Sequence, residues 1–227
     1  MKKILLTAAL LAITVGTSFA GIKNTKHDLS SGSSASVKAT NSDQICVFCH
    51  TPHNAVQSVP LWNRSAGRAA ADFRLYTSSK SLTTVAGDAK LFEDSQSLFC
   101  MNCHDATLGE LGSRVNKRAF TSDGAAINVA GASWATSSAN LGNNLTNDHP
   151  VGFSYGTAVT QDLGGLNAAS AVKTAFGEKT VFFNANNNTV TDSMECSSCH
   201  AVHDNTYTPF LRTTNSGSTL CLACHAK

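Results

Sequence analysis

Charged residues are scarce in this 227-residue chain, where Asp, Glu, Lys and Arg together make up 14%. The basic and acidic totals are nearly equal, at 17 and 15, and the sequence has no basic stripe of the kind that nucleic-acid binding requires. Aromatic residues are also few, at 7%, while Ser, Thr, Asn and Gly are abundant. We therefore expect no nucleic-acid partner and no large core built from side chains alone.

Long hydrophobic runs are missing beyond the N-terminus. The chain begins with Lys2 and Lys3, continues with an apolar stretch from Ile4 to about Val15, and reaches small residues before Ala20. This pattern is typical of a secretory signal peptide, and the stretch is too short to span a bilayer. We predict a signal peptide over 1–20, a single mature domain over 21–227, and no membrane span. Cleavage leaves 15 basic and 15 acidic residues, so the mature polypeptide is formally neutral.

All eight cysteines belong to one repeated pattern, C-x-x-C-H, which is the attachment signature of c-type haem. Two cysteines three positions apart lie on one side of a helical turn, so both sulfurs can reach the vinyl groups of one porphyrin. The histidine shares that face, and imidazole is a usual axial ligand of haem iron. The sequence therefore predicts four covalent haems c. The attachment cysteines are Cys46, Cys49, Cys100, Cys103, Cys196, Cys199, Cys221 and Cys224, and the motif histidines are His50, His104, His200 and His225.

Three other interpretations of the cysteines are weaker. A disulfide framework suits an exported chain with an even number of cysteines, and two four-cysteine zinc sites suit paired C-x-x-C units. Neither explains a histidine directly after every pair. Thioredoxin-like redox chemistry needs one such motif near a βαβ unit rather than four.

Four histidines remain outside the motifs, which matches the number of irons that need a second axial ligand. They are His27, His53, His149 and His203. We expect all four to be distal ligands, so that every iron has two imidazoles and no open position. An iron closed in this way transfers electrons and offers no substrate site, so the chain is expected to be an electron carrier and not an enzyme.

The positions of the spare histidines suggest which haem each one serves. His53 and His203 each lie three residues after a motif histidine, too close to bend to the far side of the same haem. We hypothesise that His53 binds the second haem and His203 the fourth. His149 precedes a proline, which favours an extended conformation, and we assign it to the first or third haem. His27 lies in 21–45, which is expected to be a flexible N-terminal arm.

Regular secondary structure is expected to be sparse. Residues 93–104 predict a short helix that carries the second motif, with Asp94 as a possible cap. Residues 180–183 and 189–191 flank an Asn-rich turn and predict a small β-hairpin, while 105–179 is expected to be mostly loop. The fold class is thus a multihaem cytochrome c, mostly loops with a few short helices wrapped around four haems. We expect the chain without haem to remain unfolded.

The segment 46–53 (CVFCHTPH), the four haem motifs, the early His27 and the stretch 148–151 resemble the outer-surface multihaem cytochromes of metal-reducing bacteria. Members of that family polymerise into extracellular filaments with a continuous chain of haems. The resemblance implies bis-histidine haems, a loop-rich fold and long-range electron transfer to external acceptors. It also implies identical subunits joined head to tail, with His27 binding a haem of the neighbouring subunit.

Two other functions stay open at this point. The same haems would suit a monomeric periplasmic electron shuttle that meets redox partner proteins. A multihaem oxyanion reductase would need one open haem site, so one spare histidine would not be a ligand. For the filament-forming cytochrome we expect export through the periplasm, where haem is attached, to the outer cell surface or the medium.

Overall fold

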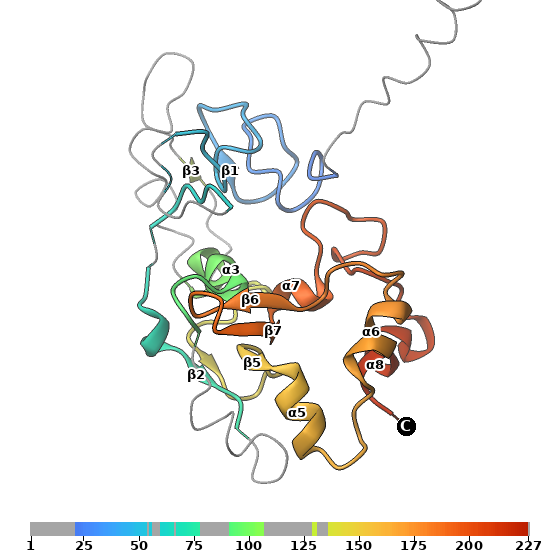
Figure 1. Ribbon diagram of the computed structural model, residues 1–227. Helices are drawn as coiled ribbons and strands as arrows, with labels where there is room; N and C mark the ends of the chain where they lie inside the picture. The colour runs from blue at the N-terminus through green and yellow to red at the C-terminus, as the bar shows by residue number, and fades with distance from the viewer. Residues whose placement is uncertain are drawn as a thin grey trace, which may run out of the picture.

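The computed structural model describes residues 21–53, 55, 60–65, 67–77, 91–106, 129–130 and 136–226. The predicted signal peptide lies outside these ranges. Short elements joined by long irregular loops make up the described part (Figure 1). The longest helix there has nine residues and the longest strand has five, which confirms the expected loop-rich chain for these residues. None of the described helices is long and apolar enough to cross a membrane.

The helices are few, and most of them carry or flank a cysteine motif. In chain order they are η1 (Ala70–Asp72), α3 (Gln96–His104), α5 (Tyr155–Gln161), α6 (Ala169–Ala175), α7 (Cys196–Cys199), η4 (Ser216–Ser218) and α8 (Thr219–Cys224). The predicted helix over 93–104 is α3, which carries the second motif. Its cap is Ser95, whose hydroxyl accepts the Leu98 N–H at 3.2 Å, and not Asp94 as expected. Asp94 instead accepts the backbone N–H groups of Asn186 and Asn187.

The strands form three small sheets. β1 (Lys38–Ala39) pairs antiparallel with β3 (Val129–Ala130), and β2 (Arg74–Leu75) pairs parallel with β4 (Asn144–Leu145). The third sheet has the order β5–β7–β6, from β5 (Phe153–Ser154), β7 (Val190–Met194) and β6 (Phe183–Ala185). β6 and β7 form the predicted hairpin. Its turn has positive φ at Asn186, Asn187 and Asn188, a conformation that asparagine tolerates better than most residues.

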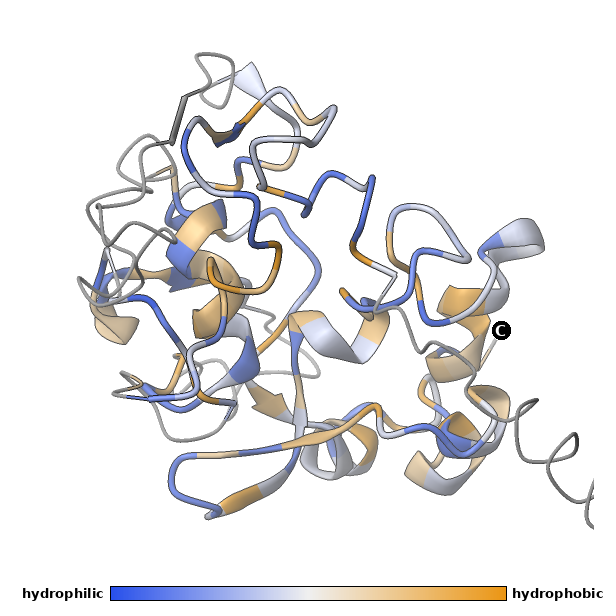
Figure 2. Cartoon of the chain, turned by 90° about the horizontal axis from the view of Figure 1, so that it is seen from above, coloured by the Kyte–Doolittle hydropathy of each residue, from blue (hydrophilic) through white to orange (hydrophobic). Residues whose placement is uncertain are grey.

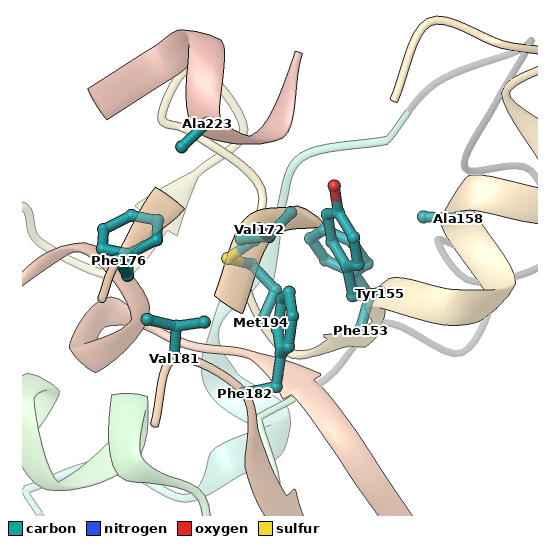
Figure 3. Packing of buried hydrophobic residues seen from close by; sticks show 9 residues of the cluster. All are labelled: Phe153, Tyr155, Ala158, Val172, Phe176, Val181, Phe182, Met194 and Ala223. Atoms are coloured by element: carbon teal, nitrogen blue, oxygen red, sulfur yellow. The ribbon is translucent and has the colours of Figure 1, made fainter. Parts of the chain in front are cut away.

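The largest apolar cluster packs β5 and β7 against α5, α6 and α8 (Figure 3). Tyr155 is almost fully buried and stacks on Phe182 with ring centroids 4.5 Å apart. Its hydroxyl donates to the carbonyl of Asn167 at 2.8 Å, so the polar end of this buried ring is satisfied. Two smaller clusters surround Phe48 and Met101, and apolar and polar segments alternate along the chain between them (Figure 2). Each cluster includes residues of a cysteine motif.

The segment 21–45 is packed onto the rest of the chain. Val37 and Ala39 are buried with Phe48, beside the first motif (Figure 1). The N–H of Gly21 donates to the carbonyl of His203 at 2.8 Å, which ties the beginning of the segment to the third motif. The expectation of a free flexible arm is therefore corrected. The segment has few large apolar residues, but those residues pack against neighbouring motifs.

Candidate haem sites

Each C-x-x-C-H motif forms one helical turn, as the chemistry of attachment requires. The backbone N–H of the motif histidine donates to the carbonyl of the first cysteine at 2.9 Å for His50, 3.1 Å for His200 and 3.0 Å for His225. The remaining motif histidine, His104 of the second motif, is the last residue of α3. The cysteines of a motif therefore lie about one turn apart on one face. All eight are free thiols, so no disulfide framework forms. Within the described ranges no group of three or more His, Cys, Asp or Glu side chains could hold a metal ion.

Three motif histidines are oriented by a carbonyl that lies behind the ring. Nδ1 lies 2.7 Å from the Pro60 carbonyl in His50, 2.6 Å from the Ala139 carbonyl in His104, and 3.0 Å from the Pro209 carbonyl in His200. A hydrogen bond of this kind puts the ring proton on Nδ1 and leaves the Nε2 lone pair for a metal. These imidazoles therefore fit the role of proximal haem ligand.

Three spare histidines face three motif histidines across a gap of constant width. The ring centroids are 6.0 Å apart for His27 and His104, 6.0 Å for His50 and His203, and 6.4 Å for His149 and His225. Two imidazoles that bind one metal from opposite sides, each at about 2 Å, place their centroids about 6 Å apart. Three ring pairs thus have the spacing of bis-histidine ligation.

These pairs correct the assignments made from sequence. His203 lies opposite His50 of the first motif, and His149 lies opposite His225 of the fourth. His27 lies opposite His104 of its own chain, which removes the reason to place it on a neighbouring subunit. Sequence separation misled these assignments, because the loops bring distant segments together and a ligand three residues from one haem can face another.

His53 and His200 are the two histidines left over. Both side chains are exposed, and within the described part of the chain neither ring meets another aromatic or imidazole ring. The imidazole of His53 also has no hydrogen-bond partner there, since only its backbone is bonded, to Thr51. The eight predicted ligands are therefore three facing pairs and two separate residues.

Three of the paired imidazoles, those of His27, His104 and His203, have lowered pKa values, which favour the neutral form that binds metals. Burial lowers the pKa of His27 to about 4, and the nearby His104, His200 and His203 add to this effect. Burial likewise lowers the pKa of His104, against the opposing effect of its bond to Ala139. The pKa of His203 is lowered by burial and then by His50. Neutral imidazoles next to one another favour the approach of a metal over that of a proton.

The described residues of the segments 46–64 and 196–212 make the same local contacts. The N–H of Thr51 donates to the Leu61 carbonyl at 3.0 Å, and the N–H of Ala201 donates to the Phe210 carbonyl at 2.7 Å. Pro60 and Pro209, whose carbonyls hold the motif histidines, were missed in the sequence. The signal was available, because each proline lies nine or ten residues after its motif histidine and precedes an apolar residue.

The second and third motifs are joined through a buried carboxylate. Glu195 is 1% exposed and accepts the Ser97 N–H at 3.0 Å, the Ser97 hydroxyl, and the Ser193 hydroxyl at 2.5 Å. The Ser97 hydroxyl oxygen also accepts the Cys196 N–H at 2.9 Å. Burial raises the pKa of Glu195, while these hydrogen bonds oppose the rise. This network fixes the start of α7 against the start of α3.

Contacts between the cysteines place the four motifs in a row that follows the sequence. Motifs one and two share an apolar cluster, motifs two and three bring two thiols within hydrogen-bonding reach, and motifs three and four line one small cavity. The cysteines concerned are Cys49 with Cys103, Cys100 with Cys196, and Cys199 with Cys224. Haems held by these motifs would be consecutive neighbours.

The chain matches the doubled CXXCH motif family over residues 188–227. This range contains the third and fourth motifs. The match indicates covalent haem c and an electron-transfer cytochrome with more than one haem. No curated protein matches the chain.

Proposed function

We propose that this chain carries electrons through four covalent haems and is the subunit of an extracellular polymer. The observation that carries the proposal is the set of three imidazole pairs at 6.0 to 6.4 Å, which leaves His53 and His200 apart. In the proposed assignment the pairs close the irons of the first, second and fourth motifs. The residues fit haem c because the cysteine turns, the neutral imidazoles and the carbonyls behind them agree on one chemistry.

Closed irons favour electron transfer over catalysis. An iron with two protein ligands changes oxidation state with little rearrangement and has no position for substrate. Two imidazoles also lack the thioether ligand that raises the potential of methionine-ligated cytochromes, so we expect low potentials. The consecutive order of the motifs supports a path from the first haem to the fourth.

The polymer is supported by the two histidines, His53 and His200, that face no other imidazole in the described part of the chain. His53 belongs to the first haem unit and His200 to the third, and both are exposed. We assign His53 of one subunit to the iron that His200 of the next subunit binds. Such an exchange is head to tail, because a different surface of each subunit is used, and it repeats without closing. The family resemblance favours the same assembly, together with export and external acceptors.

Cryo-electron microscopy of the secreted protein tests the proposal directly. The expected result is a filament in which His53 of one subunit and His200 of the next bind one iron. His53→Ala should abolish assembly while all four haems stay attached. His203→Ala is the matched control: it also removes a spare histidine, yet it should open the first iron and leave filaments. Filaments from His53→Ala, or a wild-type protein that stays small at every concentration, would contradict the polymer.

A monomeric shuttle is the second candidate, and the repeated segments favour it. Because His203 of the second repeat reaches His50 of the first, the reverse contact from His53 to His200 within one chain would be symmetric. In that case all four irons are closed in a single chain. A low-spin spectrum for every haem in a monomeric fraction would favour the shuttle.

A further inference from the structure

His200 stands apart from the other motif histidines because, among the residues that the structure describes, no imidazole ring pairs with its own. Its Nδ1 is bound to the Pro209 carbonyl at 3.0 Å, so Nε2 is presented to the haem of the third motif. The side chain is exposed, and Val202 and Tyr207 on the same loop are 38% and 42% exposed. Solvent therefore has access to this part of the molecule.

The neighbouring histidines are committed elsewhere. Burial, followed by the nearby His104, His200 and His203, lowers the pKa of His27, but its ring stacks on Phe210 at 4.6 Å and faces His104. His203 faces His50. Turning either ring toward His200 would break a pair that already has the spacing of bis-histidine ligation. Among the described residues of one chain, neither His27 nor His203 is thus available to the position opposite His200.

We propose that this position is a binding site for a small axial ligand of haem iron, and that it exists only where a neighbouring subunit is missing. The inference rests on the proposed polymer, in which His53 of the neighbour fills the position. A free chain has the site, an interior subunit does not, and each filament has it at one end. Carbon monoxide is the probe, because it binds ferrous haem with an open position and carries no charge that the surface could repel.

Carbon monoxide titration of the reduced protein tests the site, with total haem counted from the alkaline pyridine spectrum. The monomeric fraction is expected to bind about one carbon monoxide per chain, and His203→Ala about two, because a second iron is opened. Sheared filaments should bind more per haem as their mean length falls. The ferric monomer should also show one high-spin haem, which is a readout independent of the ligand.

Two outcomes would overturn the site. Wild-type monomer that binds no carbon monoxide, while His53→Ala monomer binds it, would show that His53 of the same chain fills the position. Binding that is independent of filament length would show that ends are not special. These outcomes can be told apart from failure of the polymer proposal. A monomer that binds carbon monoxide but never assembles would support the ligand site and contradict the polymer. Filaments formed by a monomer in which every iron is six-coordinate would support the polymer and contradict the site.

Discussion

The two segments that share a local structure, 46–64 and 196–212, differ in what their spare histidines meet. Both hold the motif histidine through a proline carbonyl, and in both a later side chain binds the first carbonyl inside the cysteine motif. Yet His203 crosses to His50, while His53 meets no ring in the described part of the chain. The comparison teaches that the orientation of a motif histidine is set locally by a carbonyl of the same segment, whereas the imidazole that faces it is set by the packing of distant segments.

Removing the haem of one segment at a time is expected to have the largest effect on the protein. Replacing Cys46 and Cys49 by serine, or Cys196 and Cys199, should leave about three haems per chain, because each pair forms one attachment site. The loss of each covalent closure is expected to cost about 2–4 kcal/mol of unfolding free energy. The third motif should cost more, since it contacts both the second and the fourth, while the first contacts the second.

Haem counting and guanidinium unfolding measure these variants. Four haems retained in either double variant would show that its motif is not an attachment site. Equal unfolding free energies would show that the position of a motif in the row does not matter.

His27 is expected to behave like His203, as a distal ligand within its own chain. His27→Ala removes a half-buried ring that stacks on Phe210 and faces His104. We expect one haem to become high-spin and the unfolding free energy to fall by about 2–3 kcal/mol. Lys26→Ala, at the exposed neighbouring position, is the control and should change neither quantity. Loss of filaments, with one iron opened in each separated subunit, would return His27 to a role between subunits.

The side chains that bind the first motif carbonyl allow a finer test of the repeat. Asn63 donates to the Val47 carbonyl, and Arg212 donates to the Ser197 carbonyl. Asn63→Ala should cost about 1 kcal/mol, the value of one neutral hydrogen bond. Arg212→Ala should cost about 2 kcal/mol, because the bond is charge-assisted and the guanidinium also lies 5.7 Å from the Phe183 ring centroid. Unfolding followed at the haem absorption band compares them, and a larger loss at Asn63 would contradict the repeat-based account.

The residue before the cysteine pair gives the smallest expected effect. It is Ile45 in the first segment and Glu195 in the second. Burial raises the pKa of Glu195, although Ser97 and Ser193 lower it and Asp94 adds to the rise. The folded state then holds a proton that the unfolded state releases, so stability falls as pH increases through the window above the usual carboxyl pKa.

Glu195→Gln keeps the shape of the network and removes this titration. The unfolding free energy of the variant should therefore decline less with pH than that of the wild type, by less than about 1 kcal/mol per pH unit. Guanidinium unfolding of the haem-loaded protein from about pH 4 to pH 8 measures the difference. Parallel pH profiles would show that Glu195 does not change protonation on unfolding.

Local features were predictable from the sequence because short-range chemistry fixes them. The helix at the second motif and the hairpin around Asn186 were anticipated within a few residues. The helix cap was placed one residue early, because Asp94 and Ser95 are both good caps and only the tertiary contact of Asp94 with the hairpin decides between them. The predicted haem attachment residues rest on the C-x-x-C-H spacing alone.

The distal pairings were not predictable, because each of them closes across a long loop. His27 and His104 are far apart in sequence, as are His50 and His203, and no periodic pattern links them. The packing of 21–45 was missed for a related reason. Its few apolar residues, such as Val37, are too sparse to predict burial, and they are buried only because Phe48 and the motif cysteines offer a surface.

The proline and alanine carbonyls behind the motif histidines have an electrical consequence. A carbonyl that accepts the Nδ1 proton makes the imidazole a stronger electron donor to iron, which favours the ferric state. The same hydrogen bond recurs at His50, His104 and His200, so we expect their haems to have similar reduction potentials. An electron moving along a level row of sites meets no deep trap at which it would stop. Backbone carbonyls, which no mutation of a side chain removes, would then keep the reduction potentials along the row of haems close to one another.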